Sequence, residues 1–276
     1  MLFNNVNNIN VSFDDMMNGC TCSPLTITDF RKYLIHRYSD EFLDFYEWYI
    51  DYCKKFKNIE KIKEENPYKK EIEFIINLYF NPNSKKELNI SQKNLEKLLS
   101  KSRYSTNPEI FKDVIIEVNN LIKNILFNEY INARIDNISS STKIYRVIIG
   151  ILLLLIYLIV IGLFCYKIKS RWMRLCLLPL LVYSISLSIT SYMGICSILN
   201  KKRRTEYMEW EENETANRKY KLLIYFNLPI FYKKLILIED ESLLKLQNKK
   251  VRYAIFYSLV ISIILLIITL IIPEKN

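Results

Sequence analysis

The sequence contains little of what catalytic and cofactor sites need. Only one histidine, His36, and four glycines occur among 276 residues. A hydrolase triad needs a histidine base, and a phosphate-binding loop needs closely spaced glycines, so neither is indicated. The six cysteines stand singly or as the Cys20/Cys22 pair, without the spacing of a zinc site or a disulfide framework. We therefore expect no enzymatic activity, cofactor or metal site of the chain's own.

Charge is absent from three long apolar stretches. Residues 147–166, 175–200 and 253–273 form runs of 20, 26 and 21 residues without Asp, Glu, Lys or Arg. Because roughly 20 apolar residues in a helix cross a bilayer, we predict transmembrane helices at 147–166, 175–199 and 253–272. The alternative, three buried core helices, would bury more apolar surface than a soluble domain of this size can cover. No charge lies inside these spans, which argues against a transporter or pump.

The net charge of +10 belongs to this apolar half of the chain. Residues 1–146 contain 21 basic and 20 acidic residues, whereas residues 147–276 contain 18 and 9. The excess therefore indicates membrane lipids rather than nucleic acid as a partner. Thirteen basic residues lie in the loop 200–252, which the positive-inside rule predicts to be cytoplasmic. The chain is then a multi-pass integral membrane protein with a cytoplasmic N-terminal domain, in the plasma membrane or an endomembrane.

Three features bear on this orientation. The short turn "KIKSRWMR" would lie outside despite its four basic residues. The sequences Asn137-Ile138-Ser139 and Asn213-Glu214-Thr215 are glycosylation acceptors only if they are lumenal. Residues 222–232, interrupted by Pro229, are too short to span and are interpreted as interfacial, with a re-entrant segment as the alternative.

The N-terminal half predicts an all-α domain over residues 24–137. Residues 1–23 are polar and rich in asparagine, which predicts a disordered tail. Apolar residues then recur at helical spacing and no alternating strand pattern is found. The expected helices cover 26–38, 39–56, 72–79, 91–99 and 106–125, with Ser39, Ser91 and Thr106 at their N-terminal caps. Residues 54–70, with Pro67, form a charged link.

Several motifs lie along these helices. They are "PLTITDFRKYL" from Pro24, "YSDEFLDFYEWYIDY" from Tyr38 and "KELNIS" from Lys86. Together they resemble the regulator of G-protein signalling (RGS) domain. A further likeness is to fungal RGS proteins that carry membrane spans after the domain, because "MGIC" from Met193 and the pair Trp210-Glu211 follow in the same order. The resemblance implies an RGS-like helical bundle followed by a three-span transmembrane region.

The resemblance also implies a function and a contact surface. RGS domains accelerate GTP hydrolysis by the α subunits of heterotrimeric G proteins, binding the GTP-bound or transition-state form and supplying no catalytic group. The implied Gα-binding residues are Glu41, Phe42, Glu87, Asn89, Asn128 and Asn132. The alternative for the whole chain is a non-catalytic RGS-like membrane scaffold in polarity or trafficking.

These positions differ in how closely they follow the family. Asn89 is the expected main contact, and the alternative for it is an ordinary turn residue in a polar loop. Phe42 stands where the family has asparagine, and Asn128 and Asn132 stand where it has an aspartate and an arginine. Residues 39–42 are expected to form an exposed corner that meets Gα. The inner faces of the same helix are expected to carry Leu43, Phe45, Tyr46, Tyr49 and Tyr52.

Overall fold

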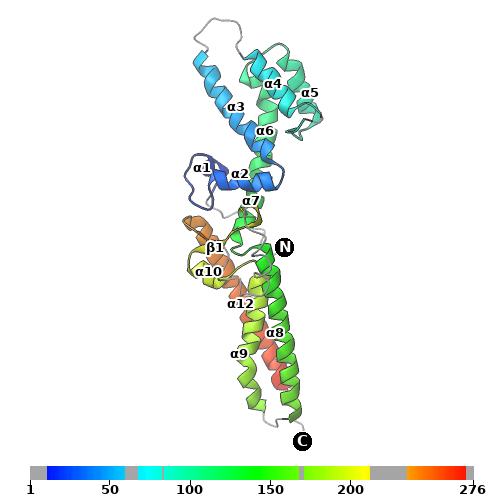
Figure 1. Cartoon of the computed structure of the whole chain (residues 1–276), viewed down its shortest axis with the longest axis vertical. Helices are drawn as coiled ribbons and strands as arrows, with labels where there is room; N and C mark the ends of the chain where they lie inside the picture. The colour runs from blue at the N-terminus through cyan, green and yellow to red at the C-terminus, as the bar shows by residue number, and fades with distance from the viewer. Residues whose placement is uncertain (1–10, 60–67, 83, 168–170, 212–234, 272–276) are drawn as a thin grey trace, which may run out of the picture. The chain divides into compact units, whose positions relative to one another are not determined.

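The computed structural model describes residues 11–59, 68–82, 84–167, 171–211 and 235–271. These residues are mostly helical, as predicted, with one two-stranded sheet (Figure 1). Their contacts divide into two compact units. We call residues 27–131 the bundle unit, and residues 11–26 together with 132–271 the apolar unit.

The bundle unit consists of successive helices. They are α2 (Ile27–His36), α3 (Asp40–Ile59), α4 (Lys69–Tyr79), α5 (Gln92–Ser102), the 3₁₀ turn η2 (Pro108–Phe111), α6 (Lys112–Leu121), the π-helical segment η3 (Ile122–Leu126) and α7 (Phe127–Ile135), whose last residues belong to the apolar unit. The π segment inserts an extra residue between α6 and α7. It therefore rotates the faces that α7 presents relative to those of α6.

An aromatic core joins α3 to its neighbours. Phe45 is completely buried, and its ring lies 5.4–6.0 Å from those of Tyr79, Phe80 and Phe111. Trp48 packs beside it and donates its indole N–H to Glu71 on α4 over 3.1 Å. Because aromatic pairs add stabilisation beyond the area they bury, α3 is the fixed central element of the unit.

The apolar unit begins with α1 (Phe13–Met17), which is capped by Ser12 and buries Phe13 and Met16. Its other elements are α8 (Ser140–Lys167), η4 (Arg171–Leu177), α9 (Leu178–Tyr192), α10 (Ser197–Lys201), β1 (Arg204–Glu206), η5 (Glu209–Glu211), β2 (Leu235–Leu237) and α12 (Glu241–Ile271). Strands β1 and β2 pair antiparallel, with Thr205 opposite Ile236.

Three helical stretches of this unit are long and apolar enough to cross a membrane: Ser140–Tyr166, Arg174–Tyr192 and Glu241–Ile271. Helix α9 packs against both α8 and α12 (Figure 1). The α8–α9 contact depends on Gly150, because a Cβ there would overlap the hydroxyl of Ser188 and lie 3.0 Å from its backbone nitrogen. Gly162, also on α8, has open space around it.

A buried polar layer lies at one end of these helices. Arg134 and Glu211 form a two-bond ion pair whose side chains are 0% and 4% exposed, and the Arg134 guanidinium lies 5.4 Å from the Trp210 ring. Glu206 accepts hydrogen bonds from the hydroxyls of Ser139 and Thr142 over 3.0 and 2.8 Å. These bonds tie the start of α8 to the connection between α9 and α12.

Asn137 belongs to the same layer. Its side chain is completely buried, donating to the carbonyl of Cys196 over 3.0 Å and accepting from the Cys196 N–H over 2.6 Å. The backbone N–H of Asn137 also donates to Gly194, whose φ is +73°. A Cβ on Gly194 would overlap the Asp136 carboxylate, so this turn requires glycine.

Several predicted boundaries differ from the structure. The prediction of a disordered tail over residues 1–23 is wrong for Phe13–Met17. Burial of Phe13 and Met16 gives α1 a tertiary contact that local composition does not reveal. The second apolar helix ends at Tyr192 rather than at 199, since Gly194 turns the chain within an uncharged run. Within 200–252 the chain already forms β1, β2 and the start of α12. Asn213, residues 222–232 and Pro67 lie outside the described residues.

Two predicted helix caps also need correction. Asn107, not Thr106, accepts the N–H of Glu109, because the next residue, Pro108, starts the 3₁₀ turn. The Ser39 hydroxyl is buried with no hydrogen-bond partner among the described residues, so it does not cap α3 as expected.

Candidate functional site

The corner between α2 and α3 is the first of three segments that carry the predicted contact residues. The corner is closed by the N–H of Ser39, which donates to Leu34 over 3.0 Å. Tyr38 has φ +52° and is 90% exposed. A left-handed backbone is unusual for a tyrosine. The corner therefore presents an aromatic side chain to solvent that the sequence motifs did not single out.

The second segment is the connection from α4 to α5, which contains Glu87 and Asn89. Between them Leu88 is only 4% exposed, and its N–H donates to Tyr79 over 2.8 Å. Because successive residues of an extended segment point to opposite sides, Glu87 and Asn89 face outward, and both are exposed. The structure thus presents the predicted main contact, Asn89, on the surface.

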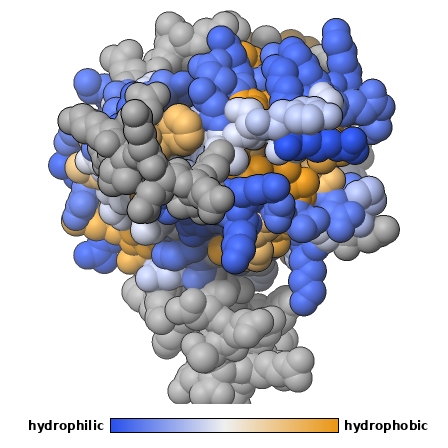
Figure 2. Space-filling model, turned by 90° about the horizontal axis from the view of Figure 1, so that it is seen from above, coloured by the Kyte–Doolittle hydropathy of each residue, from blue (hydrophilic) through white to orange (hydrophobic). Residues whose placement is uncertain are grey.

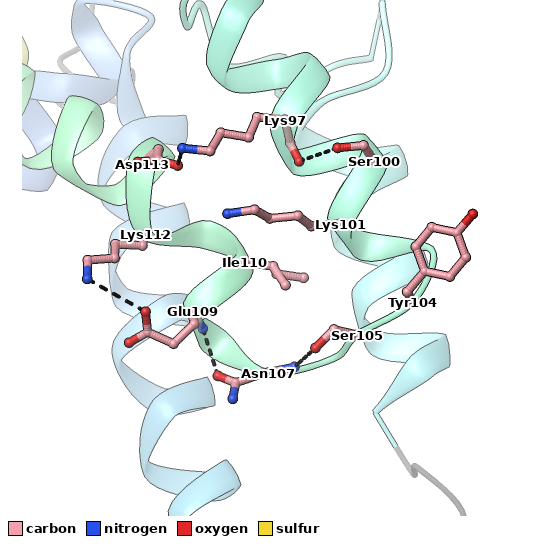
Figure 3. Close-up of a pocket in the computed structure, with 10 residues that line it drawn as sticks. All are labelled: Lys97, Ser100, Lys101, Tyr104, Ser105, Asn107, Glu109, Ile110, Lys112 and Asp113. Atoms are coloured by element: carbon pink, nitrogen blue, oxygen red, sulfur yellow. Dashed lines mark hydrogen bonds and ion pairs between the residues drawn. The ribbon is translucent and has the colours of Figure 1, made fainter.

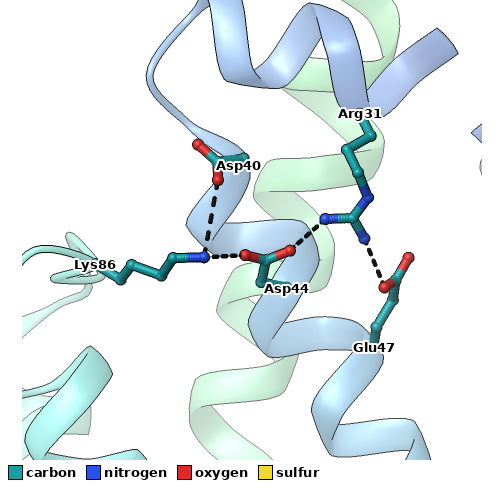
Figure 4. Close-up of polar contacts among 5 residues, drawn as sticks. All are labelled: Arg31, Asp40, Asp44, Glu47 and Lys86. Carbon is teal, nitrogen blue, oxygen red and sulfur yellow. Dashed lines mark hydrogen bonds and ion pairs between the residues drawn. The ribbon is translucent and has the colours of Figure 1, made fainter. Parts of the chain in front are cut away.

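Lys86 ties this connection to the start of α3 (Figure 4). Its ammonium group pairs with Asp44 and lies 3.9 Å from Asp40. Asp44 also pairs with Arg31 of α2, whose guanidinium bonds Glu47 over 2.6 Å. Burial opposes ionisation of Asp44, but the bonds from Lys86 and Arg31 outweigh it and lower the pKa of its carboxyl. A charged network therefore holds the α4–α5 connection against α3.

Glu41 lies within reach of the same lysine. It is half-buried, and its pKa is raised first by burial and further by the nearby Asp40 and Asp44 carboxylates, while the charge of Lys86 opposes the shift. Since Lys86 directly precedes Glu87, the structure brings the Glu41 and Glu87 positions to one region of the bundle unit.

Glu117 fixes the other end of the α4–α5 connection. Its carboxylate accepts from the N–H and the hydroxyl of Ser91, both over 2.8 Å, and from the Asn94 amide over 2.6 Å. These bonds lower the pKa of Glu117 despite its burial. Ser91 occupies the predicted N-cap of α5, but its hydroxyl bonds Glu117 instead of the helix. Asn89 is therefore bracketed by two anchored positions, Lys86 and Ser91.

Helix α7 is the third segment. Glu129 on its first turn pairs with Arg37 of the α2–α3 corner over 2.9 Å. Asn128 is half-buried, and its amide donates to the Asn124 carbonyl over 2.9 Å. Asn132 is exposed one turn later, but it belongs to the apolar unit. The structure thus brings Glu41 to the connection that carries Glu87 and Asn89, and the Arg37–Glu129 pair joins the start of α7 to the α2–α3 corner.

The predicted exposed corner at 39–42 needs correction. Phe42 is 7% exposed and Ser39 is 9% exposed, so both belong to the interior, whereas Asp40 and Glu41 are half-buried. The physical reason is the position of α3 between its neighbours, which leaves only one side of its first turn outside. An apolar side chain at position 42 is favourable in this interior.

Sequence reasoning missed four residues of this region: Arg37, Tyr38, Lys86 and Glu117. Three of them act through ion pairs or hydrogen bonds with residues 26 to 92 positions away in the chain. No local pattern indicates such partners. For Tyr38 the only signal was its position at the junction of two expected helices, directly before the expected cap residue Ser39.

A separate cavity of about 720 Å³ lies between α5 and α6 (Figure 3). Lys97 pairs with Asp113 over 2.6 Å, and Lys112 lies 3.7 Å from Glu109, so both acids of the lining face lysines. The Lys97 bond lowers the pKa of Asp113, which is therefore ionised and no proton donor at neutral pH. This cavity lacks an acid–base pair suited to catalysis.

The wider surface can also be described by its potential metal ligands and its apolar areas. Among the described residues no group of three or more His, Cys, Asp or Glu is arranged to hold a metal ion. Figure 2 shows a mostly hydrophilic face with separate, small hydrophobic areas. Such a surface suits a partner that is bound through polar loops and a few exposed rings.

Comparison with known proteins gives one finding for this domain. Residues 15–135 match the family model described as the regulator of G protein signaling domain. Neither the curated proteins nor the solved structures gave a significant match. The matched segment is less than half of the 276 residues, and it includes every candidate contact residue named above.

Proposed function

We propose, from the premise that residues 15–135 form an RGS domain, that this chain is a membrane-tethered GTPase-activating protein for G-protein α subunits. In this function the domain attenuates signalling by shortening the lifetime of GTP-bound Gα. The observation that carries the proposal is the outward-facing pair Glu87 and Asn89 on a connection anchored at Lys86 and Ser91. The three apolar helices are the proposed tether.

The mechanism needs no catalytic group from this chain. Gα already holds its arginine in cis, and its own glutamine orients the attacking water. A partner accelerates the reaction when it binds the transition-state arrangement of the switch segments more tightly than the ground state. Asn89 is proposed to contact those segments beside the catalytic glutamine, with Glu41 and Glu87 as flanking acidic contacts.

The rigidity of the α4–α5 connection supports this mechanism. Differential binding requires a surface that does not readjust to each form of its partner. The Lys86 network and the Glu117 bonds fix both ends of the segment that carries Asn89. Tyr38 at the α2–α3 corner is added to the proposed contact surface because its ring is 90% exposed.

A tether would raise the encounter rate, because Gα is itself held at a membrane. In this proposal the RGS domain and the connection between α9 and α12 face the cytoplasm, as the 13 basic residues of 200–252 indicate. The proposed compartment is the plasma membrane or an endomembrane. The likeness to fungal membrane-anchored RGS proteins belongs to the same proposal.

The second candidate is a non-catalytic RGS-like scaffold in polarity or trafficking. Two observations favour it. Phe42 is buried where the family has asparagine, and the Asn128 amide bonds its own helix where the family has an aspartate. An uncharged amide forms weaker bonds to a partner than a carboxylate does.

Single-turnover GTP hydrolysis by purified Gα, with the full chain in detergent micelles, separates the two functions. We expect acceleration that Asn89→Ala reduces by about tenfold to a hundredfold, as the loss of one bond made in the transition state predicts. Asn81→Ala is the matched control, because Asn81 is exposed on the same connection. An unchanged rate at saturating chain, or full activity of Asn89→Ala, would exclude the proposed mechanism.

A further inference from the structure

Helix α12 carries a basic stripe just before its uncharged segment. Lys245, Lys249 and Arg252 are all exposed. Their spacing of four and three residues places them on one face of the helix. Residues 244, 247, 251 and 254 form the buried face of the same helix. The three cations therefore lie together on the side of α12 that is turned away from its packed neighbours.

Helix α10 adds two more cations beside this stripe. The side chains of Asn200 and Asn248 are joined by a hydrogen bond of 2.6 Å. Asn248 lies next to the stripe on α12, and Asn200 directly precedes Lys201 and Lys202, which are both exposed. We call Lys201, Lys202, Lys245, Lys249 and Arg252 the basic cluster.

The cluster differs from two neighbouring cations, Arg203 and Lys250, in how its charge is balanced. Arg203 forms an ion pair with Glu241, and Lys250 forms one with Asp136. Among the described residues no ion pair joins any member of the basic cluster to an acid. Five positive charges on two adjoining elements are therefore available to an anion.

The height of the cluster matches the headgroup zone of a bilayer. Arg252 directly precedes the uncharged segment of α12, and the exposed rings of Tyr253 and Phe256 follow it. At 1.5 Å per residue, Lys249 lies about 4.5 Å and Lys245 about 10 Å further along the helix axis. A headgroup region is about 5–8 Å thick in each leaflet, so these side chains extend through it and slightly beyond.

We infer that the basic cluster binds phosphorylated anionic lipid headgroups of the membrane leaflet from which α12 emerges. This inference rests on the membrane tether of the proposed function. Lysine and arginine attract phosphate, and the flanking aromatic rings lie at the level that such residues prefer in membranes. A headgroup whose phosphates project beyond the lipid phosphate plane reaches Lys245 as well as Arg252.

The test uses the purified full chain in a non-ionic detergent. A fluorescent short-chain phosphatidylinositol bisphosphate is the probe, and its anisotropy reports binding. Each cation near a lipid surface contributes about a fivefold factor, so Lys245→Gln, Lys249→Gln and Arg252→Gln together are expected to weaken binding about a hundredfold. The double change Lys201→Gln and Lys202→Gln is expected to weaken it about 25-fold.

A matched control removes the same charge elsewhere. The triple change Lys97→Gln, Lys101→Gln and Lys112→Gln, in the cavity between α5 and α6, is expected to leave binding unchanged. Equal weakening by both triple variants would overturn the site, because net charge alone would then explain binding. A variant with Lys245→Arg and Lys249→Arg should retain affinity; loss of binding there would also contradict a phosphate contact that either cation can make.

Competitors identify the source of the headgroup. Unlabelled phosphatidylinositol bisphosphate is expected to displace the probe, and phosphatidylcholine is not. If soluble inositol trisphosphate competes as well as the lipid, the assignment to a membrane lipid fails. GTP hydrolysis and probe binding measured on the unchanged chain separate the two proposals, because failure of that chain to bind the probe, with intact acceleration, contradicts the lipid site alone. Absent acceleration with intact probe binding contradicts only the GTPase-activating function.

Discussion

Replacing Glu211 by glutamine should destabilise the apolar unit far more than the same change at Glu241. Both carboxylates pair with an arginine of the same unit, Arg134 for Glu211 and Arg203 for Glu241. The side chains of the first pair are 0% and 4% exposed, and those of the second are 50% and 61% exposed. The two variants remove the same charge, so their difference isolates the effect of burial.

The magnitude follows from what each arginine keeps after the change. In Glu211→Gln the guanidinium of Arg134 stays charged and buried without a counter-charge, which costs about 3–5 kcal/mol. The glutamine oxygen still accepts one bond, so the lower end of this range is expected. In Glu241→Gln water replaces the lost partner of Arg203, and exposed pairs contribute about 0–1 kcal/mol.

The assay is thermal unfolding of the full chain in detergent, followed by intrinsic fluorescence. For a unit of this size 1 kcal/mol shifts Tm by about 2–4 °C, so Glu211→Gln should lower it by about 6 °C or more and Glu241→Gln by less than about 4 °C. The double variant Arg134→Met with Glu211→Leu should be more stable than Glu211→Gln, because no buried charge remains. Equal shifts for the two single variants would refute the reasoning.

Further predictions concern packing, backbone conformation and pH. Gly150→Leu should lower Tm or prevent folding because α9 leaves no room for a side chain. Gly162→Leu should fold normally, because a Cβ added at Gly162 meets no described heavy atom within 4 Å. In chemical unfolding, Gly194→Ala should destabilise the chain more than Gly19→Ala does. Both glycines have φ above +70°, but only a Cβ at position 194 also overlaps a carboxylate. Equal losses of stability would contradict the structure. The folded-state pKa of Asp44 is depressed, so its stabilisation is complete above its ordinary pKa of about 3.9 and is lost as pH falls through the folded value. Asp44→Asn should therefore lower stability at pH 7, and a difference from the wild type that persists unchanged in strong acid would contradict this linkage.

Local signals were sufficient for much of the bundle unit. The helical spacing of residues 72–79 predicted α4, and a serine before an apolar pattern correctly placed the start of α5 at Gln92. These features depend on residues close together in the chain. Fold class followed in the same way, because no segment of the first half alternates as a strand does.

The rest depended on contacts that sequence spacing does not encode. Phe42 was expected outside because the resemblance places it at a contact position of the family, and only the packing around α3 shows that it is buried. Lys86 and Glu117 hold the segment of Asn89 through partners 42 and 26 residues away. The second apolar helix was predicted too long because the uncharged run on which the prediction rested continues past the turn at Gly194.

The burial of Asn137 changes what a glycosylation experiment can report. A glycan on this side chain would displace both bonds to Cys196 and would have to pass through a closed polar layer. A folded chain with an unmodified Asn137 is therefore expected whether the α7–α8 junction faces the cytoplasm or the lumen. Modification of Asn137 therefore does not report the orientation of the chain. Of the two acceptor sequences, only the one at Asn213 can report it.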